Sequence, residues 1–415
     1  MSIILERFRE TLSKMKDYNI KREAEFEIQY PTGFLNFDFM NGNKVRVKSA
    51  ERNLEYYSIG IPDGCMMSII GRSGCGKTTF AVQVASNIVR PFDNGVVIHE
   101  DIEGGINDIR MQSLTGFYGD DFERRYARRN AGITAENFYQ RMKILHDDKV
   151  EHYEDYSYDT GLFDPEGNRV FKLVPTVVIL DSVALLMPGK FTEEEELSGS
   201  MSATASAKTN SSLFKRLMPM LKAANIILIM INHITDQIDI NPMQRKKGQL
   251  AYLKQGEALP GGKTITYLSN FMIRCDDNTK LKGEEAFGIN GILVDMQICK
   301  SRNARSGLTT TLVFDYDNGF DPELSLLVML KERKLVGGAG AYLYLKDRSD
   351  IKFSQKQFKE KLIENPEFAQ LFIETCLETL KADIDANEKS NETLSNTIVD
   401  FRSMMLNQVN GVNVA

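Results

Sequence analysis

The sequence is poor in cysteine and has no long run of apolar residues. Its five cysteines are scattered at positions 65, 75, 275, 299 and 376, and no two of them have a CxxC spacing. The odd number and the scatter argue against a disulfide framework or a structural zinc site, and they are typical of a reducing cytoplasm. The longest apolar candidate, residues 226–234, contains Asn232 and His233 and is shorter than the roughly 20 residues that span a bilayer. We therefore expect a cytoplasmic protein that has no membrane partner.

The sequence also has fewer basic than acidic residues. The 415 residues include 51 Lys and Arg against 57 Asp and Glu, which gives a net charge of −6. An acidic balance disfavours a surface covered with non-specific nucleic-acid contacts, but it leaves room for a site confined to a groove or to a few loops. The chain is longer than is usual for a domain with a single hydrophobic core, so we expect one large domain with smaller additional segments. The first ten residues mix acidic and basic side chains without a long apolar segment, and they do not predict a signal peptide.

The strongest motif is a glycine-rich segment that matches the pattern GxxxxGK[ST]. The apolar residues 65–70 before it are typical of a buried parallel strand, and residues 80–89 after it have helical spacing. In this context the backbone N–H groups of the loop and the helix N-terminus would hold the phosphates of ATP. Lys77 would reach the β- and γ-phosphates, and the Thr78 hydroxyl would hold Mg²⁺. The alternative, a glycine-rich turn with a chance Lys-Thr pair, is disfavoured by the flanking strand and helix. The predicted nucleotide-binding residues are Gly71, Arg72, Ser73, Gly74, Cys75, Gly76, Lys77, Thr78 and Thr79.

Two further apolar runs end in polar residues. Residues 176–180 lead into Asp181, as in a buried strand whose carboxyl end opens onto a nucleotide crevice. Asp181 would there hold the magnesium ion through water, although an Asp at this point could also cap the next helix. Residues 226–231 lead into Asn232 and His233. A polar residue at that strand end could touch the γ-phosphate; a hydrogen-bonded core histidine is the alternative.

A predicted strand at residues 96–98 leads into an acidic loop that offers a general base. ATP hydrolysis needs a carboxylate that orients and polarises a water molecule in line with the γ-phosphate. Glu100, Asp101 and Glu103 are all candidates, and their spacing does not choose among them. For each residue taken singly, a solvated acidic loop without a catalytic role is the alternative.

Taken in order, several short segments resemble the RecA family of recombinases, and most of all its tailed-phage branch, the UvsX-type recombinases. The resemblance extends from about Thr32 to about Tyr344, and a histidine at 233, where cellular RecA has glutamine, is typical of the phage branch. It implies an α/β fold: a RecA-like P-loop ATPase core with a mostly parallel twisted sheet flanked by helices, an N-terminal helix and a small helical C-terminal domain. The segments are TGFLNFD (32–38), IPDG (61–64), LDSVAL (180–185), SLFKR (212–216), INHI (231–234), CKSR (299–302), FDPE (320–323) and GAGAY (338–342).

The resemblance also implies roles for individual residues. Glu103 matches the catalytic glutamate of the family, with Glu100 as the second choice, and His233 takes the place of the sensor that couples the γ-phosphate to the DNA loops. Lys300 and Arg302 match basic residues that reach the ATP of the next subunit in active filaments, where a cation supplied in trans stabilises the γ-phosphate charge. Without the resemblance they would be a solvated strand end.

Arg110 departs from the family pattern. It stands where the family usually has a tyrosine stacked on adenine. A guanidinium can also stack on a base, so ATP binding is still expected, with altered recognition of the base.

Two segments are predicted to be surface loops. Residues 187–209 are rich in Gly, Ser, Ala and Thr and contain the acidic run Glu193–Glu196, which we interpret as a solvated or regulatory stretch. Residues 235–263 form a long loop of the kind that is functional or disordered. In the RecA family the matching loops grip single-stranded DNA through basic residues and stacking aromatics. The candidate DNA-binding residues are Arg245, Lys246, Lys247, Tyr252, Lys254, Gly261 and Gly262.

The chain is predicted to have three parts. Residues 1–30 hold an amphipathic helix for oligomerisation and a linker; packing of this helix on its own core is the alternative. Residues 31–345 form the RecA-like ATPase core, with insertions near 42–57 and 131–172, the second containing a hairpin (156–163 with 170–173) and preceded by a basic helix face at Arg124–Arg129. Residues 346–415 form a C-terminal helical domain, with a partly disordered tail after Lys381.

The expected function is therefore an ATP-dependent, single-stranded-DNA-stimulated ATPase that forms helical filaments and exchanges DNA strands in recombination, repair and recombination-dependent replication. Its cofactors would be ATP and Mg²⁺. Its partners would be single-stranded DNA, duplex DNA during pairing, other copies of the chain, and single-strand-binding or loader proteins. If a phage encodes it, it acts in the cytoplasm of a bacterial host. A hexameric DNA helicase with the RecA fold is the alternative, and a scaffold that uses ATP as a structural ligand is a third hypothesis.

Overall fold

The structure is a computed structural model, and it describes most of the chain. The described residues are 26–49, 51–105, 107–189, 199–236, 252–260, 263–281, 287–302, 304–339, 342–345 and 348–409, with side chains described throughout except at 199–207, 263–264, 339 and 389–409. Three expectations lie outside these residues: the N-terminal helix, the acidic run Glu193–Glu196, and the candidate DNA contacts Arg245, Lys246, Lys247, Gly261 and Gly262.

Within the described residues, the central sheet has nine strands. Six neighbouring strands are parallel, and three further strands are added in antiparallel order at one side. In spatial order they are β17 (Gly319–Asp321), β16 (Thr309–Asp315), β15 (Gly291–Ser301), β14 (Phe271–Lys280), β5 (Met66–Gly71), β11 (Ile226–His233), β10 (Thr176–Asp181), β6 (Val96–Asp101) and β7 (Tyr126–Arg129).

The register brings the carboxyl ends of the parallel strands to one edge of the sheet. Asp181, at the end of β10, lies opposite Ile231 in β11 and Asp101 in β6. His233, at the end of β11, lies opposite Gly71, the last residue of β5. These central strands are buried on both faces, which is why their sequences are continuous apolar runs. The glycine-rich loop and the polar strand ends must therefore share this edge.

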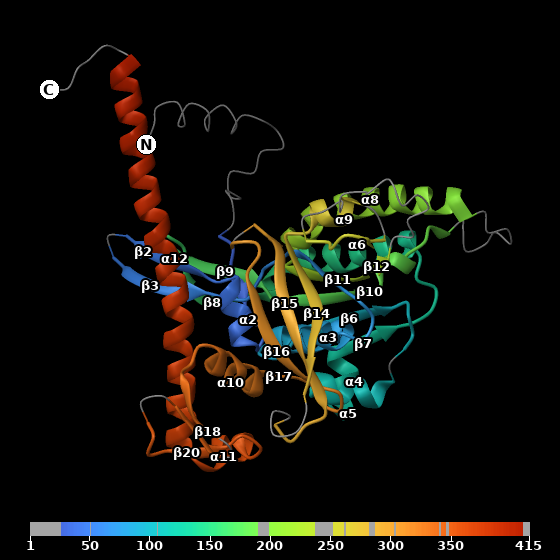
Figure 1. Ribbon diagram of the computed structural model, residues 1–415. Coiled ribbons are helices and arrows are strands. Elements are labelled where there is room, and N and C mark those ends of the chain that lie inside the picture. The colour runs from blue at the N-terminus through green and yellow to red at the C-terminus, as the bar shows by residue number, and fades with distance from the viewer. Residues whose placement is uncertain are drawn as a thin grey trace.

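Helices cover both faces of the sheet, as Figure 1 shows. On one face α3 packs on β5, β6, β10 and β11, and α4 packs on α3; on the other, α8 packs on β11 and α6 packs on α8. This architecture confirms the predicted fold class. The helices of the core are α2 (Leu35–Met40), α3 (Lys77–Val89), α4 (Asp108–Thr115), α5 (Gly119–Arg125), α6 (Ala135–Glu151), α7 (Tyr153–Tyr156), the 3-10 helix η2 (Val183–Leu185), α8 (Gly199–Ala223), α9 (Lys263–Leu268) and α10 (Pro322–Glu332).

The two predicted insertions contain β-hairpins that touch each other. The first is β2 (Asn43–Lys48) with β3 (Asn53–Ser58), and the second is β8 (Ser157–Phe163) with β9 (Arg169–Leu173), close to the hairpin expected from the sequence. The Tyr56 hydroxyl donates to the Phe163 carbonyl at 2.9 Å, and the Arg52 guanidinium lies 4.0 Å from the centre of the Phe163 ring. The insertions thus form one continuous surface feature. Two short pairs complete the strands: β1 (Gln29–Tyr30) with β4 (Ile61–Pro62), and β12 (Thr235–Asp236) with β13 (Glu257–Ala258).

The C-terminal region differs from our expectation in two ways. The expected boundary at residue 346 falls inside a three-stranded sheet, β18 (Val336–Ala339), β19 (Tyr342–Leu345) and β20 (Lys352–Ser354), whose strands pair across it. After α11 (Phe358–Glu364), helix α12 (Pro366–Val409) continues through Lys381, where we expected a partly disordered tail to begin.

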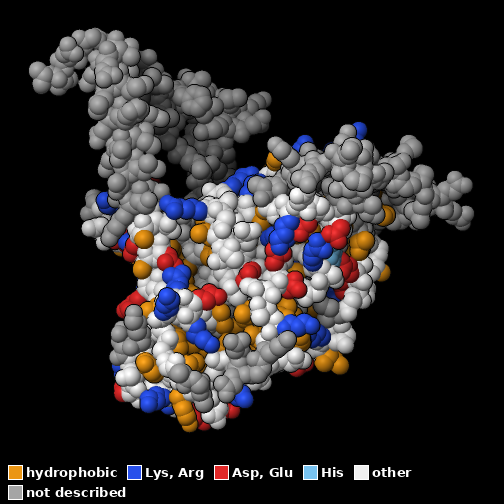
Figure 2. Space-filling view, in the orientation of Figure 1, with side chains coloured by type: hydrophobic (Ala, Val, Ile, Leu, Met, Phe, Trp, Pro, Cys, Tyr) orange, Lys and Arg blue, Asp and Glu red, His pale blue; other side chains and the backbone are white. Residues whose placement is uncertain are grey.

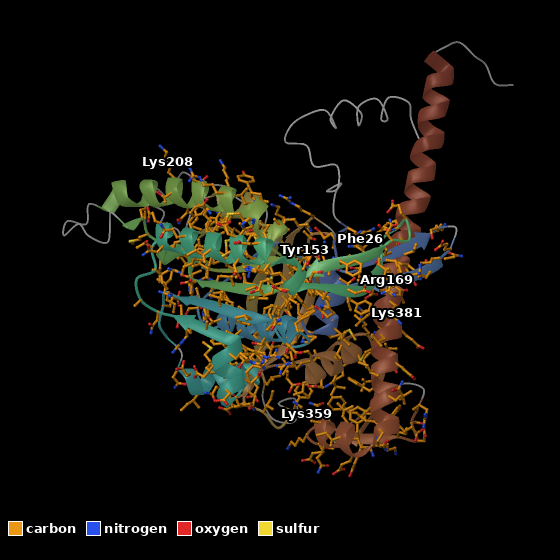
Figure 3. The ribbon with its side chains drawn as sticks, turned by 180° about the vertical axis from the view of Figure 1, so that it is seen from behind. Phe26, Tyr153, Arg169, Lys208, Lys359 and Lys381 are labelled. Atoms are coloured by element: carbon orange, nitrogen blue, oxygen red, sulfur yellow. The ribbon has the colours of Figure 1, made fainter. Side chains whose placement is uncertain are left out.

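The part of α12 just past Lys381 contacts the first hairpin. Lys44 of the first hairpin and Asp385 of α12 form an ion pair at 3.2 Å, and Arg46 and Glu388 form another at 2.6 Å. The Lys381 ammonium lies 5.7 Å from the centre of the Tyr57 ring. Figure 3 shows Lys381 and Arg169, which belongs to the second hairpin, on the same side of the molecule. Asp385 and Glu388, which we expected in a disordered tail, therefore form ion pairs with the β2–β3 hairpin.

Four arginines, Arg124, Arg125, Arg128 and Arg129, were expected on one helix face, and this prediction was wrong. Helix α5 ends at Arg125, and Arg128 and Arg129 belong to the edge strand β7. Arg128 lies 2.7 Å from Asp108 and 3.5 Å from Asp101, so it is engaged in ion pairs. In the part of the chain that the structure describes, no helix combines the length and apolar character needed to cross a membrane.

Candidate active site

The glycine-rich loop joins β5 to α3 in the conformation that a phosphate site requires. Gly74 and Gly76 have φ values of +85° and +81°, a left-handed region that side-chain-bearing residues rarely adopt. A Cβ added at Gly74 would meet no atom within 4 Å, so this part of the loop faces open space. Lys77, the first residue of α3, donates a hydrogen bond from Nζ to the Arg72 carbonyl at 2.7 Å. The loop therefore surrounds an accessible cradle with a lysine at its base.

Thr78 and Asp181 meet beside this cradle. The Thr78 hydroxyl donates to Asp181 Oδ2 at 2.5 Å, and Asp181 Oδ1 is buried without a hydrogen-bond partner among the described residues. Burial, followed by the charges of Glu103 and Asp101, raises the pKa of Asp181 to about 6. A buried carboxylate with a free oxygen favours a cation at this position. A threonine hydroxyl and one carboxylate are few ligands, as expected for Mg²⁺, which keeps waters and takes substrate phosphates as further ligands. The residues present thus fit a magnesium–nucleotide complex.

The three candidate general bases have different environments. Glu100 is buried and accepts two hydrogen bonds from Arg141, both at 2.7 Å. Asp101 is also buried, and its Oδ1 accepts from the Gly104 backbone N–H at 2.8 Å. The Glu103 side chain is 37% exposed. Since a general base must reach a water molecule, the geometry favours Glu103 over the two buried acids.

Glu103 and His233 are hydrogen-bonded to each other. His233 Nε2 lies 2.7 Å from Glu103 Oε1, and the Glu103 backbone N–H donates to the Asp181 carbonyl at 3.3 Å. The Ile234 backbone N–H donates to the Gly71 carbonyl at 3.0 Å, which ties the residue after His233 to the start of the loop. Glu103, His233 and Asp181 therefore lie together beside the glycine-rich loop.

Lys300 and Arg302 lie away from the phosphate loop of their own chain. Lys300 pairs with Met272, and Met272 pairs with Ser68, which precedes Gly71 by three residues, or about 10 Å at the usual strand rise. Lys300 Nζ donates to the carbonyls of Thr266 and Tyr267 at 2.9 and 2.7 Å, at the end of α9. Arg302 is exposed. Among the described residues, the side-chain hydrogen bonds of Lys300 go to the end of α9 and not to the glycine-rich loop.

Arg110, in α4, is held by the carbonyls that follow β16. Its guanidinium donates to the carbonyls of Asp317 and Tyr316, the second at 3.1 Å. Tyr316 itself is 44% exposed. The guanidinium is thus bound to the turn that follows β16.

Of the candidate DNA contacts, only Tyr252 and Lys254 belong to the described residues. Tyr252 is partly buried against an apolar cluster that includes Ile234 and Met272, and burial raises its pKa. Lys254 is exposed and lies 3.4 Å from Asp276. On the face drawn in Figure 2, basic and acidic side chains are interspersed, so the described surface in that view carries no continuous basic track.

Two contacts of this region could not be predicted from the sequence. Arg141, which holds Glu100, comes from α6 within the second insertion, 41 residues further along the chain. Arg72 of the glycine-rich loop pairs with Asp236 at 2.7 Å. No motif signals either pair, because both join segments that only the sheet topology brings together.

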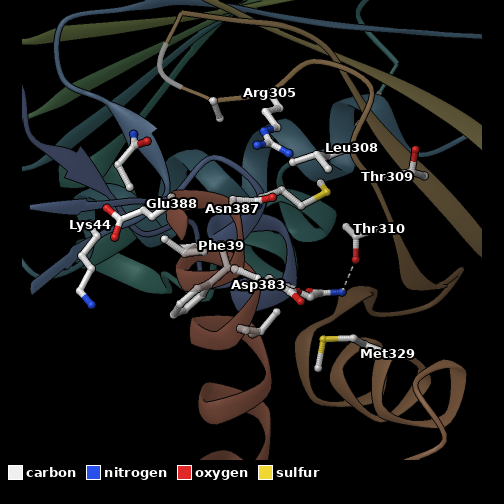
Figure 4. A pocket seen from close by; sticks show the side chains of 18 of the residues that line it. Phe39, Lys44, Arg305, Leu308, Thr309, Thr310, Met329, Asp383, Asn387 and Glu388 are labelled. Atoms are coloured by element: carbon white, nitrogen blue, oxygen red, sulfur yellow. Dashed lines mark hydrogen bonds between the residues drawn. The ribbon is translucent and has the colours of Figure 1, made fainter. Parts of the chain in front are cut away.

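A cavity of about 590 Å³ lies elsewhere in the molecule, between α2, the β15–β16 turn, α10 and α12 (Figure 4). Lys44, Arg305, Thr310 and Asp383 are among the residues that line it. None of its lining residues belongs to the glycine-rich loop or to the ends of β6, β10 and β11. It is separate from the candidate active site.

The fold and the site together define a P-loop protein of the α/β class, with an acid at the end of β10, which β11 separates from the P-loop strand β5. A scan against protein-family models found no match. RecA of Macrococcus caseolyticus is 24% identical over 315 residues, which cover 74% of each protein. RecA of Thermus thermophilus is 22% identical over 318 residues (75% of this chain and 78% of the relative), and RecA of Aquifex aeolicus is 23% identical over 316 residues (74% and 75%). These similarities support membership of the RecA family.

Proposed function

We propose that this chain is an ATP-dependent recombinase that forms helical filaments on single-stranded DNA and exchanges strands with a duplex. The observation that carries the proposal is the meeting of Lys77, the Thr78–Asp181 pair and the Glu103–His233 pair at one edge of the sheet. Similarity to RecA proteins over about three-quarters of the chain supports recombination, as opposed to another P-loop activity. Within the family we propose the UvsX-type phage branch, on the basis of His233 and the segments quoted above.

In this proposal the glycine-rich loop binds the phosphates of ATP through its backbone N–H groups, and Lys77 turns its ammonium from the Arg72 carbonyl toward them. Thr78 and Asp181 hold Mg²⁺, which when bound supplies positive charge to the phosphate oxygens. Glu103 orients a water molecule and takes its proton. Arg110 stacks on or borders the adenine base.

His233 is the residue that senses the γ-phosphate. Its imidazole contacts the general base, and β11, which carries it, continues directly into β12 at the start of the second predicted loop. Loss of the γ-phosphate can therefore change the Glu103–His233 contact and the start of that loop together. We propose that the loop, with Arg245, Lys246 and Lys247, neutralises DNA phosphates and that Tyr252 packs against a base.

Lys300 and Arg302 act on the nucleotide of a neighbouring subunit in this proposal. Their distance from the loop of their own chain supports a role in trans, because a cation must approach the γ-phosphate closely to stabilise it. Lys300 would exchange its two carbonyl partners for phosphate oxygens on assembly. The three-part organisation belongs to the same proposal: an oligomerisation segment at 1–30, the ATPase core with its two insertions, and a C-terminal domain.

The test combines an ATPase assay with electron microscopy of the assembled protein. We expect ATP hydrolysis to rise on adding single-stranded DNA, helical filaments with ATP and DNA, and loss of turnover in Lys77→Ala. Rings in place of filaments would support a helicase, and filaments without turnover would support a scaffold. A matched control is Lys334→Ala, which removes an exposed lysine outside the site.

A further inference from the structure

Two of the five cysteines lie together beside the glycine-rich loop. Cys75 belongs to the loop itself, and Cys275 lies in β14, where it pairs with Gly71, the last residue of β5. A Cβ added at Gly71 would lie 2.9 Å from Cys75 Sγ and 3.3 Å from Cys275 Cβ. Because Gly71 has no side chain, the two thiols have room to meet, and a hydrogen bond joins them.

This hydrogen bond makes the two thiols chemically different. It is the largest cause that lowers the pKa of Cys75; burial opposes it, and the Lys77 ammonium, whose Nζ lies 4.0 Å from Cys75 Sγ, adds to it. The same hydrogen bond, together with burial, raises the pKa of Cys275 well above that of a free thiol. As a thiol, Cys75 donates to the Arg72 carbonyl at 3.0 Å, a bond that ionisation gives up. Cys75 is therefore the partner that forms the thiolate, which is the nucleophilic state of cysteine.

The other three cysteines have environments that make them unreactive. Cys65 and Cys376 are buried, and Cys299 is partly buried. Burial raises the pKa of both Cys299 and Cys376 to about 12, and it raises the pKa of Cys65 as well. Cysteines in such apolar surroundings stay protonated and inert. Reactivity is thus confined to the pair at the loop.

Of the two partners, Cys75 is the one that can move. Cys275 is fully buried in β14, which pairs with β5 on one side and with β15 on the other. Cys75 stands between Gly74 and Gly76, and glycines give the backbone around it more freedom than other residues would. A Cβ added at Gly74 would meet no atom within 4 Å, so the loop is open on that side. Local opening of the loop therefore lets an oxidant of the size of water reach Cys75.

We propose that Cys75 and Cys275 are a redox-sensitive pair whose disulfide closes the phosphate site. The oxidant is a hydroperoxide, such as hydrogen peroxide. The Cys75 thiolate attacks one peroxide oxygen and becomes a sulfenic acid, and the departing hydroxide takes the proton that Cys75 lost on ionisation. The Cys275 thiol then attacks the Cys75 sulfur, the S–O bond breaks, and the Cys275 proton leaves with the hydroxyl as water. Two thiols are oxidised to one disulfide, and one peroxide is reduced to two waters.

The disulfide acts on the site through the position of the loop. The backbone N–H of Cys75 belongs to the loop that wraps phosphate, and Lys77 must leave the Arg72 carbonyl to reach it. A covalent bond to β14 holds Cys75 back and prevents this rearrangement. Disulfides of this transient, sensing kind are the ones found in a reducing cytoplasm. The effect on nucleotide rests on the proposed function, whereas formation of the disulfide does not.

The test is treatment of the full-length protein with hydrogen peroxide, followed by dithiothreitol in half of each sample. Trypsin digestion without reductant and mass spectrometry should find residues 73–77 joined to residues 275–280 in protein that runs as a single chain. Oxidation should weaken binding of Mg²⁺–ADP by about tenfold or more, the loss expected for one hydrogen bond to a charged group. Dithiothreitol should restore the binding.

Three variants assign the roles of the thiols. Cys75→Ser should bind Mg²⁺–ADP equally well before and after peroxide. Cys275→Ala should form no link, and dithiothreitol should not restore its binding, because a sulfenic acid without a thiol partner is oxidised further. Cys299→Ser is the matched control, and it should respond to peroxide and to dithiothreitol as the wild type does.

Three results would overturn the proposal: no link between residues 73–77 and 275–280 in oxidised wild type, a link that leaves binding of Mg²⁺–ADP unchanged, or equal loss of binding in Cys75→Ser. Absence of ADP binding by the reduced wild type contradicts the proposed function instead. In that case the mass-spectrometric link still decides whether the two cysteines form a redox pair.

Discussion

Replacing two neighbouring glutamates one at a time should separate catalysis from folding. Glu103→Gln removes a carboxylate that is 37% exposed and has His233 as its partner. Loss of such a pair changes stability by about 0–1 kcal/mol. Loss of general-base catalysis should lower kcat by about 10²- to 10⁴-fold. DNA binding in the presence of ATP should persist, because glutamine keeps the size and the hydrogen-bonding capacity of the side chain.

Glu100→Gln should instead lower the stability of the fold and leave ATP turnover nearly unchanged. Glu100 is 2% exposed, and both of its oxygens accept hydrogen bonds from Arg141 at 2.7 Å. Removing one partner of a buried ion pair costs about 3–5 kcal/mol. Glutamine retains one acceptor, so we expect a loss of about 2–3 kcal/mol. For a large domain, each kcal/mol of lost stability lowers Tm by about 2–4 °C, so Tm should fall by about 4–12 °C.

The assay measures DNA-stimulated ATP turnover and thermal unfolding, followed by circular dichroism, on the same preparations of both variants. Turnover by the folded Glu100→Gln protein should stay within a few-fold of the wild type at temperatures below its Tm. If Glu103→Gln hydrolyses ATP at the wild-type rate, Glu103 is not the base. If Glu100→Gln unfolds at the wild-type temperature and yet lacks turnover, Glu100 takes that role and the argument from burial is refuted.

Two further predictions concern the metal-side carboxylate and the contact between subunits. Burial raises the pKa of Asp181 to about 6, so the folded state keeps this proton where the unfolded chain has lost it. The free energy of unfolding of the nucleotide-free protein should fall by at most about 3 kcal/mol as the pH rises from about 4 to about 6. In Asp181→Asn, thermal unfolding over the same pH range should show a smaller decrease in stability. Lys300→Ala should lower turnover only in assembled protein, and nucleotide binding by dilute, unassembled subunits should match the wild type. Equal loss of nucleotide binding in unassembled subunits would contradict the role in trans.

The sequence was sufficient for the central strands and the phosphate loop because both have strong local signals. Strands buried on both faces need continuous apolar runs, and a loop that wraps phosphate needs glycines at left-handed positions such as Gly74 and Gly76. The direction of parallel strands then placed Asp181 and His233 at the same edge as Gly71. These residues could be predicted without coordinates.

Local sequence patterns were misleading where contacts between residues far apart in the sequence decide the structure. The polar composition after Lys381 suggested a tail, but Lys44 and Arg46 hold α12 there through Asp385 and Glu388. The four arginines between 124 and 129 suggested a helix face, but pairing with β6 places the last two in a strand. In both cases the partner lies in a distant part of the sequence.

The sequence by itself determined the class of fold, the phosphate loop and the set of acids from which a base could come. The spacing of the acids did not distinguish Glu100 from Glu103, because two carboxylates three residues apart have the same chemistry until their surroundings are known; only the family resemblance favoured Glu103. The tertiary structure distinguished them by burying Glu100 against Arg141 and leaving Glu103 accessible beside His233. It also joined Arg72 to Asp236 across 164 positions, a contact that exists because β5 and β11 are neighbours in the sheet and that no local pattern encodes.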